Sequence, residues 1–247
     1  MTSNHKTHQP STFDPASNNN DLEVKAFLEF RETGKISLKY AIPLGIKSLL
    51  TDLPFAVLKY WPGPVGFKLR QLFYKFRAKS FGQNVLISHS TEITYPQSIS
   101  FSDYSFIDHH VTLDSLCGQI SVGRRVHIAP YAMVIGVGGV VIGDYVGVGS
   151  FARIYSHSEA PIDGKRMSGP MIPESMKGMI TAPVILEKDS LVGTGAVLLP
   201  GVTLGEGAIV AANSFVPANT KIKPWSIYAG VPARLVGLRN KVTVTDN

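Results

Sequence analysis

Seven histidines and one cysteine are the side chains of this 247-residue chain best suited to chemistry near neutral pH. Two of the histidines lie in a polar N-terminal tail. His157 differs from the rest because it lies in "SFARIYSHSEAPIDGKRMSGP", residues 150–170, where a regular spacing of aliphatic residues stops. An imidazole at such a break can act as a general base. His157 is therefore the first candidate, with His110 and His127 as alternatives, while Cys117 has no obvious base beside it.

The interrupted pattern is a repeat of six residues. From Leu186 the chain reads LEKDSL VGTGAV LLPGVT LGEGAI VAANSF VPANTK, each block opening on Leu or Val with a small residue at its fifth place. Blocks in the same phase begin upstream at Val122 and Ile142. A period of six matches neither an α-helix nor an alternating strand. It predicts a solenoid of triangular cross-section, whose coils must stack to bury their aliphatic side chains.

The block starts fall in groups of three, and each group makes one coil. They lie at positions 101, 107 and 113, then 122, 128 and 134, then 142, 148 and 154, then 186, 192 and 198, then 204, 210 and 216. Within a group the step is six residues, and extra residues enter only between groups. All surplus length should therefore leave from one corner. We expect residues 155–185 to form a loop there, with His157 at its root.

The segments around the repeat divide the chain. Residues 1–20 are rich in Ser, Asn and Pro and are predicted to be a disordered tail. We expect a helical segment over 21–81, the β-helix over 82–223, and a cap and tail over 224–247. The start of the chain has no apolar signal region, and one cysteine suits a reducing compartment, so we expect a cytoplasmic protein.

The helical segment carries the charge asymmetry of the chain. Residues 53–91 contain no Asp or Glu but six Lys and Arg, which equals the net charge of +6. "GFKLRQLFYKFRAKSF" predicts a basic amphipathic helix. Two interpretations stay open: it packs on its own protein, or residues 65–81 contact the anionic inner face of a membrane. Nucleic acid is not expected, because no recognition motif accompanies the charge.

A membrane-spanning helix is not predicted from the sequence. The most apolar stretch, "YAIPLGIKSLLTDLPFAVLKYW", is broken by Lys47, Asp52 and two prolines. It therefore falls short of the ~18 uninterrupted apolar residues that a span needs.

The hexapeptide blocks, the corner loop with its histidine, "GTGAVLLPGVTLGEGAIVAANSFV" and the closing "IYAGVPARLVG" resemble the left-handed β-helix acyltransferases, and most of all the sugar O-acetyltransferases. The likeness covers residues 82–240. It implies a mainly β fold: a left-handed parallel β-helix with an N-terminal helical segment and a corner loop. It also implies a homotrimer that moves an acetyl group from acetyl-CoA to a hydroxyl, less readily an amine, of a sugar or polysaccharide precursor.

The same resemblance implies roles for individual residues. His157 matches the catalytic base, which the family places in a cleft shared with a neighbouring subunit. Thr194 in "VGTGAV" and Ala212 in "VAANSF" match small residues whose backbone contacts the pantetheine arm of CoA. Arg234 in "AGVPARLVG" matches the basic residue that meets the nucleotide phosphates, a contact that suits a guanidinium.

One departure from the family affects the phosphate contacts. Pro217 and Ala218 stand where the galactoside-type members have Thr-Lys. We therefore expect Lys221, Lys223 or Arg239 to supply the missing contact.

Other questions remain open at this level. The carboxylate that orients His157 could be Glu159, Asp163 or Asp108. The loop after His157, with Lys165 and Arg166, is expected to line the acceptor pocket. A γ-class carbonic anhydrase shares the prism but holds zinc with three histidines. No metal is expected here, because the chain has no pair of histidines five residues apart within one coil. A non-catalytic scaffold is the other alternative.

Overall fold

The computed structural model describes residues 22–116, 118–167, 169 and 171–244. The tail predicted over residues 1–20 and Cys117 lie outside the described residues.

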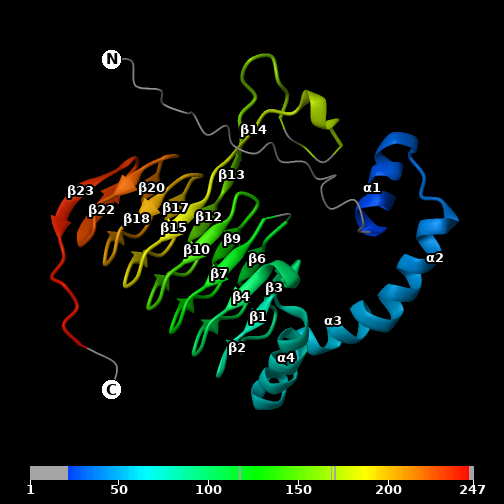
Figure 1. The fold of residues 1–247 in the computed structure, drawn as a ribbon, viewed down its shortest axis with the longest axis horizontal. Coiled ribbons are helices and arrows are strands. Elements are labelled where there is room, and N and C mark those ends of the chain that lie inside the picture. The colour runs from blue at the N-terminus through cyan, green and yellow to red at the C-terminus, as the bar shows by residue number, and fades with distance from the viewer. Residues whose placement is uncertain (1–21, 117, 168, 170, 245–247) are drawn as a thin grey trace, which may run out of the picture.

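Three parallel sheets form the sides of a prism (Figure 1). The first sheet has seven strands. In spatial order they are β1 (Ser80–Phe81), β4 (Ile99–Phe101), β7 (Ile120–Val122), β10 (Val140–Ile142), β15 (Val184–Leu186), β18 (Thr203–Leu204) and β21 (Lys221–Ile222).

The second sheet has eight strands and the third has six. The second contains β2 (Leu86–Ile87), β5 (Phe106–Ile107), β8 (His127–Ile128), β11 (Gly147–Val148), β16 (Leu191–Val192), β19 (Ile209–Val210), β22 (Ser226–Gly230) and β23 (Ala233–Leu238). The third contains β3 (Glu92–Thr94), β6 (Thr112–Asp114), β9 (Met133–Ile135), β12 (Arg153–Tyr155), β17 (Val197–Leu198) and β20 (Phe215–Val216).

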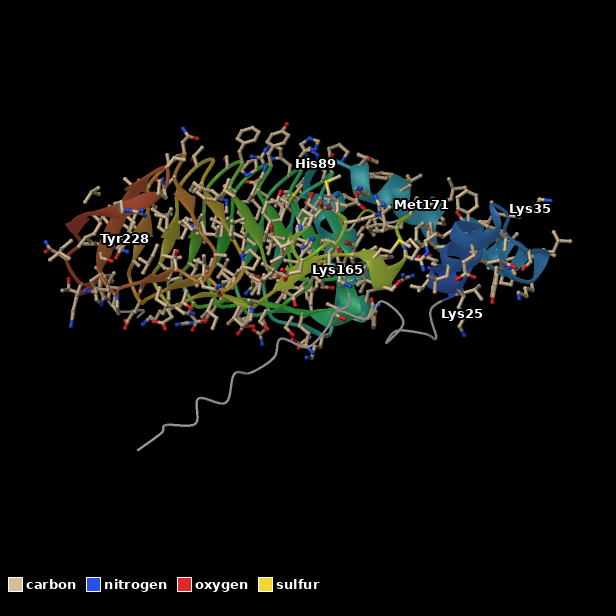
Figure 2. All side chains as sticks on the ribbon, turned by 90° about the horizontal axis from the view of Figure 1, so that it is seen from above. Lys25, Lys35, His89, Lys165, Met171 and Tyr228 are labelled. Atoms are coloured by element: carbon tan, nitrogen blue, oxygen red, sulfur yellow. The ribbon has the colours of Figure 1, made fainter. Side chains whose placement is uncertain are left out.

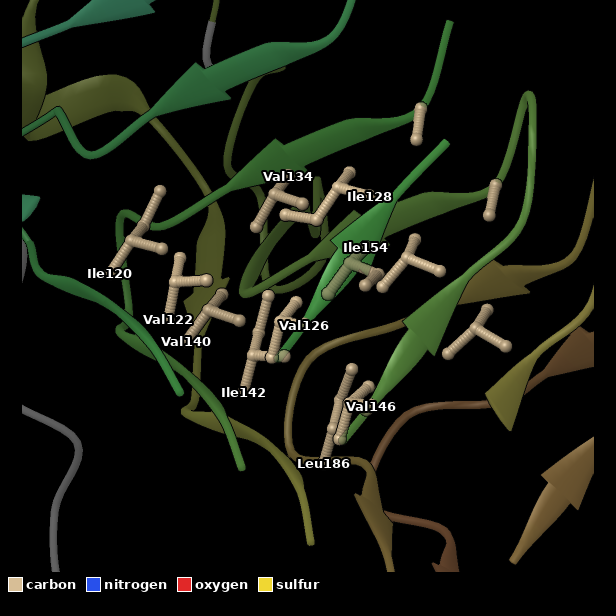
Figure 3. Close-up of a cluster of buried hydrophobic side chains, with 14 of the residues drawn as sticks. Ile120, Val122, Val126, Ile128, Val134, Val140, Ile142, Val146, Ile154 and Leu186 are labelled. Atoms are coloured by element: carbon tan, nitrogen blue, oxygen red, sulfur yellow. The ribbon is translucent and has the colours of Figure 1, made fainter. Parts of the chain in front are cut away.

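The core confirms the predicted six-residue phase. Every block start from Phe101 to Val216 is buried, and equivalent starts pair between neighbouring coils, as Ile142 does with Leu186. The small fifth residues are buried beside them, for example Ala152 and Ala196. Figure 3 shows these aliphatic side chains pointing into the prism from different strands. Each strand buries little by itself, so stacking supplies the core.

Three short corners separate the sheets, and only one of them accommodates extra length. The corner from the third sheet back to the first holds a 3-10 turn (Pro96–Ser98), the residues 115–116 and 118–119, the segment 136–139, and the long excursion after β12. The prediction that surplus residues leave from one corner is therefore confirmed. In Figure 1 the excursion rises from the side of the prism as a separate arm.

Helices precede the prism and close its first coil. They are α1 (Leu22–Thr33), α2 (Leu38–Lys47), a π-helical turn (Ser48–Asp52), α3 (Leu53–Tyr60) and α4 (Gly63–Arg77). Strand β1 begins three residues after α4 ends, at Ser80. Figure 1 shows the helices beyond the β1–β3 end of the prism, with α2 and α3 extending away from it.

Helix α4 packs on the first coil through a row of residues spaced four apart: Gly66, Arg70 and Tyr74 are buried. The Arg70 guanidinium donates to the carbonyls of Ile87 (2.9 Å), Trp61 (2.7 Å) and Leu58 (3.2 Å). These bonds join β2, α4 and the end of α3. The first of our two interpretations of the basic helix, packing on its own protein, therefore describes one side of α4.

The expectation for the apolar stretch before α4 needs correction. Pro43 and Pro54 do not break it, and the helix runs from Leu38 to Tyr60, 23 residues with none of its most apolar window buried. The π-turn between α2 and α3 absorbs the local disturbance. By length and composition this one described helix is sufficient to cross a membrane.

Candidate active site

His157 lies at the foot of the arm. Strand β12 ends at Tyr155, Ser156 turns inward, and β13 (His157–Glu159) then pairs with β14 (Met179–Thr181) as an antiparallel ribbon. His157 stands opposite Thr181. The expected loop over 155–185 is thus an arm with a two-stranded base, which holds the imidazole on hydrogen-bonded backbone.

Ser156 fixes the arm to the prism. Its buried hydroxyl donates to the Ile135 carbonyl at 2.7 Å and accepts from the Gly138 amide at 2.9 Å. The Ser156 carbonyl accepts from the Ala182 amide in the returning leg at 3.0 Å. A Cβ on Gly138 would lie 2.4 Å from the Ser156 carbonyl oxygen and 2.9 Å from the Ala182 nitrogen. Only glycine fits at this crossing.

The environment of His157 suits a neutral imidazole. The side chain is half-buried, and its Nδ1 atom is buried without a hydrogen-bond partner among the residues that the structure describes. Burial lowers the pKa of His157 below its usual value, and the negative charges of Asp114 and Glu159 partly oppose that shift. The ring is therefore unprotonated at neutral pH and can accept a proton.

Asp114 is the carboxylate that sequence reasoning missed. It lies on β6, and Ile135 of β9 pairs with both Asp114 and Tyr155 of β12. These three residues form a column on the outside of the third sheet, which leads from Asp114 to the base of the arm. Asp114 and Tyr155 each follow a block start by one residue, so the six-residue phase contained the signal.

The three carboxylates predicted from the sequence to orient His157 differ in where they lie and in what they contact. The charge of Glu159 acts on His157 less strongly than that of Asp114. Asp108 instead contacts His109 Nδ1 at 2.8 Å and His127 Nε2 at 3.4 Å, on another part of the prism. Asp163 is exposed on the arm, and the charges that shift the pKa of His157 are those of Asp114 and Glu159.

The alternative bases lie on other parts of the prism: His110 at the corner between the second and third sheets, and His127 on strand β8 of the second sheet. The His110 ring stacks on Tyr131 with centroids 4.8 Å apart, and Tyr131 stacks on Phe151 at 5.0 Å. The His127 ring stacks on Phe106 at 5.3 Å. His110 and Tyr131 continue a ladder that includes His89, labelled in Figure 2. The ladder accounts for the His110 imidazole by packing, and the separate stack on Phe106 with the contact to Asp108 accounts for that of His127.

Thr194 and Ala212 lie on this same corner, farther along the prism. Thr194 lies between β16 and β17, and Ala212 lies between β19 and β20 one coil later. The coils touch closely, because a Cβ on Gly193 would be 2.5 Å from the Ala212 nitrogen. Both residues are exposed. Within one subunit the third sheet separates them from His157, since its strands begin at their corner and end at the arm.

Arg234 lies on the terminal hairpin. Strands β22 and β23 pair antiparallel, with Arg234 opposite Ala229, and the guanidinium is exposed and donates to the Ala233 carbonyl at 3.0 Å. Arg239 is committed elsewhere: it donates to the carbonyls of Asp189 (2.8 Å) and Gly207 (3.2 Å). Lys221 also bonds within the prism, to Thr203 Oγ1 at 2.7 Å.

Comparison with known proteins identifies the family. Residues 183–218 match the family model described as the hexapeptide repeat of succinyl-transferase. The chain is 32% identical over 163 residues to a dTDP-4-amino-4,6-dideoxy-D-glucose acyltransferase of Escherichia coli, covering 66% of this chain and 83% of the relative. The chain belongs to the hexapeptide-repeat acyltransferases. Within this family of left-handed β-helices, its relatives include sugar acyltransferases.

Two further likenesses support the placement in this family. A structure of a single-residue mutant of AntD, an N-acyltransferase from Bacillus cereus, in complex with dTDP and coenzyme A superposes with a TM-score of 0.64 at 32% identity, covering 70% of this chain and 90% of AntD. A colanic acid biosynthesis acetyltransferase of Escherichia coli, WcaF, is 23% identical and covers 76% of this chain and 80% of its own length.

The chain also resembles a member of the γ-class carbonic anhydrases, the metal-dependent alternative considered from the sequence. A mitochondrial γ carbonic anhydrase of Arabidopsis thaliana is 33% identical over 47% of this chain and 49% of its own length. Among the residues that the structure describes, no group of three or more His, Cys, Asp or Glu side chains could hold a metal ion. His110 and His127 are held by Tyr131 and by Phe106 with Asp108, so this alternative gains no site from them.

Proposed function

We propose that this acyltransferase moves an acetyl group from acetyl-CoA to a hydroxyl of a sugar or polysaccharide precursor, with His157 as general base. The acceptor oxygen attacks the thioester carbon while its proton passes to the imidazole, and the proton then goes to the departing CoA thiolate. The coenzyme A bound by the AntD structure and the acetyl transfer in the name of WcaF support this donor.

The observation that supports this mechanism best is the environment of His157. Burial lowers its pKa, while the charges of Asp114 and Glu159 restore part of its basicity. A general base is most useful when it is unprotonated at working pH and still basic enough to accept the proton. The two-stranded base of the arm fixes the direction of the ring.

The separation of the predicted residues supports a site shared by two subunits. His157 lies at one edge of the third sheet, whereas Thr194 and Ala212 lie at the corner along the other edge. A thioester held at that corner reaches an imidazole most directly across a groove between two prisms. We therefore infer a homotrimer in which one subunit supplies His157 and its neighbour supplies Thr194, Ala212 and Arg234.

The arm offers an acceptor surface of mixed character. Its exposed apolar side chains are Ile162, Met167, Met171, Met176 and Ile180. Lys165, which we expected in the pocket, donates to the Ser175 carbonyl at 2.8 Å and so stiffens the arm. Figure 2 shows Lys165 and Met171 on the arm seen from above. Methionines adapt their shape to a ligand, and this suits an acceptor pocket.

The test is transfer of labelled acetyl groups by the purified protein to a panel of sugars, nucleotide-linked sugars and amino sugars. We expect the product to be an ester, which mild alkali cleaves, and we expect turnover to depend on His157. An alkali-stable product would identify an amide and would contradict the O-acetyl assignment. Transfer to no acceptor in the panel, with acetyl-CoA neither bound nor hydrolysed, would contradict the transferase itself.

Acylation of a sugar amine is the second candidate, because the Escherichia coli relative and AntD are both acyltransferases of the amino-sugar or N-acyl type. An amine is a better nucleophile and needs less help from a base. If the acceptor is an amine, removing His157 should reduce turnover much less than it does for a hydroxyl.

Mixed oligomers test the shared site. His157→Ala and Arg234→Ala chains, each weakly active alone at low acetyl-CoA, should regain activity when co-expressed, because some sites then combine intact residues from two subunits. No recovery would show that both residues serve the site from the same subunit.

A further inference from the structure

The helical segment presents apolar side chains to solvent along a continuous line. On the helix from Leu38 to Tyr60 the exposed large apolar residues recur at intervals of three and four. They are Leu38, Ile42, Ile46, Leu49, Leu50, Leu53, Val57 and Tyr60. Such spacing places them on one side of a helix, and we call this set the α2–α3 stripe.

The opposite side of the same helix contacts the protein. Lys47 pairs with Glu23 of α1, and Lys59 pairs with Glu92 of β3. The Phe55 ring stacks on Phe73 of α4 with centroids 4.2 Å apart. These contacts fix which side of the helix faces the protein, and the α2–α3 stripe on the other side remains uncovered in the described part of the chain: Leu50 is 72% exposed.

Helix α4 repeats the arrangement beside it. Its buried row packs on the first coil, while Val65, Leu69, Leu72 and Phe76 form an exposed apolar row, which we call the α4 stripe. Phe76 is 79% exposed. Lys68 and Lys75 are exposed and lie three or four residues from members of this stripe, so they flank it.

We infer that the α2–α3 stripe and the α4 stripe both contact an anionic lipid bilayer, with the helix from Leu38 to Tyr60 lying in the plane of the interface. An in-plane amphipathic helix buries an apolar face and keeps basic residues near the lipid head groups. The helix from Leu38 to Tyr60 is about 34 Å long at 1.5 Å per residue, and gives an extended contact. Trp61 and Tyr60, both exposed, suit the interfacial region.

The charge of the helical segment favours an anionic bilayer over a second copy of the chain as the partner of the two stripes. Residues 53–91 carry six Lys and Arg and no acidic residue. Arg70 is buried and Lys59 pairs with Glu92, so the cations of α4 that can meet an anionic surface are the exposed Lys68, Lys75 and Arg77. An anionic surface attracts such a segment by about 1 kcal/mol for each basic residue near it, whereas a copy of this chain would bring the same cations together. The in-plane orientation follows from the packing, since Lys47 and Lys59 are paired with protein carboxylates on the inner side.

The experiment measures sedimentation of the full-length protein with vesicles, without CoA or acceptor. We expect binding to phosphatidylcholine vesicles containing phosphatidylglycerol, little binding to phosphatidylcholine alone, and weakening as salt is raised. Leu50→Glu and Phe76→Glu should each lower the bound fraction at least tenfold. Val244→Glu, which adds the same charge at an exposed valine outside both stripes, should leave it unchanged.

The Lys75→Glu variant separates the electrostatic contribution to vesicle binding from the apolar contribution. We expect about a tenfold loss on anionic vesicles, with no effect from Lys241→Glu, which makes the same change of charge near the other end of the chain. Equal binding of wild type and all stripe variants would overturn the proposal. So would a fall in oligomer mass in Leu50→Glu or Phe76→Glu without any loss of vesicle binding, because the stripes would then be subunit contacts.

These outcomes are independent of the proposed catalysis. His157→Ala should bind vesicles like the wild type, and the stripe variants should retain acetyl transfer to soluble acceptors. Vesicle binding that is lost only in His157→Ala would contradict the docking surface assigned here.

Discussion

Asp114 exerts the strongest charge effect on His157, from a strand two coils away. The negative charge raises the pKa of His157 against the lowering effect of burial. In Asp114→Asn we expect the pKa of His157 to fall further, so the acidic limb of the pH–rate profile moves to lower pH. Because the base also becomes weaker, the plateau should fall by about tenfold or less.

Asp163→Asn is the matched control for that measurement, since Asp163 is exposed on the arm and the charge acting on His157 comes from other residues. Its pH–rate profile should superimpose on that of the wild type. A shift of the acidic limb to higher pH in Asp114→Asn would have the wrong sign and would exclude the electrostatic role.

Removing the imidazole should stop chemistry without affecting donor binding. We expect His157→Ala to lower kcat by about 10²–10⁴, as a positioned base contributes, with the Kd for CoA by calorimetry unchanged. His110→Ala and His127→Ala should retain most activity, because both rings are explained by stacking. A collapse of kcat in either of these variants instead would place the base at His110 or His127 and not on the arm.

Substitutions of Arg234 and Arg239 should have different effects, the first on acetyl-CoA binding and the second on the stability of the fold. Arg234→Ala removes an exposed guanidinium and should raise the KM for acetyl-CoA about tenfold with little change in kcat or Tm. Arg239→Ala removes bonds to two carbonyls of the last coils and should lower Tm instead. An unchanged KM in Arg234→Ala would move the phosphate contact to another cation.

Gly138 should control the position of the arm. Gly138→Ala introduces a Cβ 2.4 Å from the Ser156 carbonyl oxygen, so the two legs of the arm must shift. We expect kcat to fall at least tenfold while far-ultraviolet circular dichroism retains the β-helix signal. Gly169→Ala is the control on the same arm, because its Cβ would meet only ordinary contact, with Ile172 at 3.8 Å. Full activity of Gly138→Ala would show that the arm tolerates displacement.

Arg70 should anchor the helical segment to the prism. Arg70→Ala deletes the bonds to Ile87, Trp61 and Leu58 and opens a cavity, so we expect a loss of about 3–5 kcal/mol of unfolding free energy. Arg77→Ala, whose guanidinium is exposed and stacks on Phe73 at 4.7 Å, should cost about 1 kcal/mol or less. Denaturant unfolding measures both. Equal effects would mean that Arg70 is not the anchor.

The sequence alone determined the prism, because stacking requires one large inward residue every six positions and Phe101 through Val216 supply it. The same phase located the extruding corner and hence the root of the arm at His157. Helix continuity through Pro43 and Pro54 was not predictable from the charges and prolines, since a π-turn and contacts with α1 and α4 decide it.

Tertiary structure alone decided which groups meet. Asp114 is remote from His157 along the chain, and only the pairing of β6, β9 and β12 aligns them. It also decided that the predicted donor residues Thr194 and Ala212 share a corner with the aromatic ladder rather than with the base. The six-residue period predicts which side chains point outward. The stacking of the coils determines which of these outward side chains become neighbours. The surface that this packing leaves uncovered is visible only after folding.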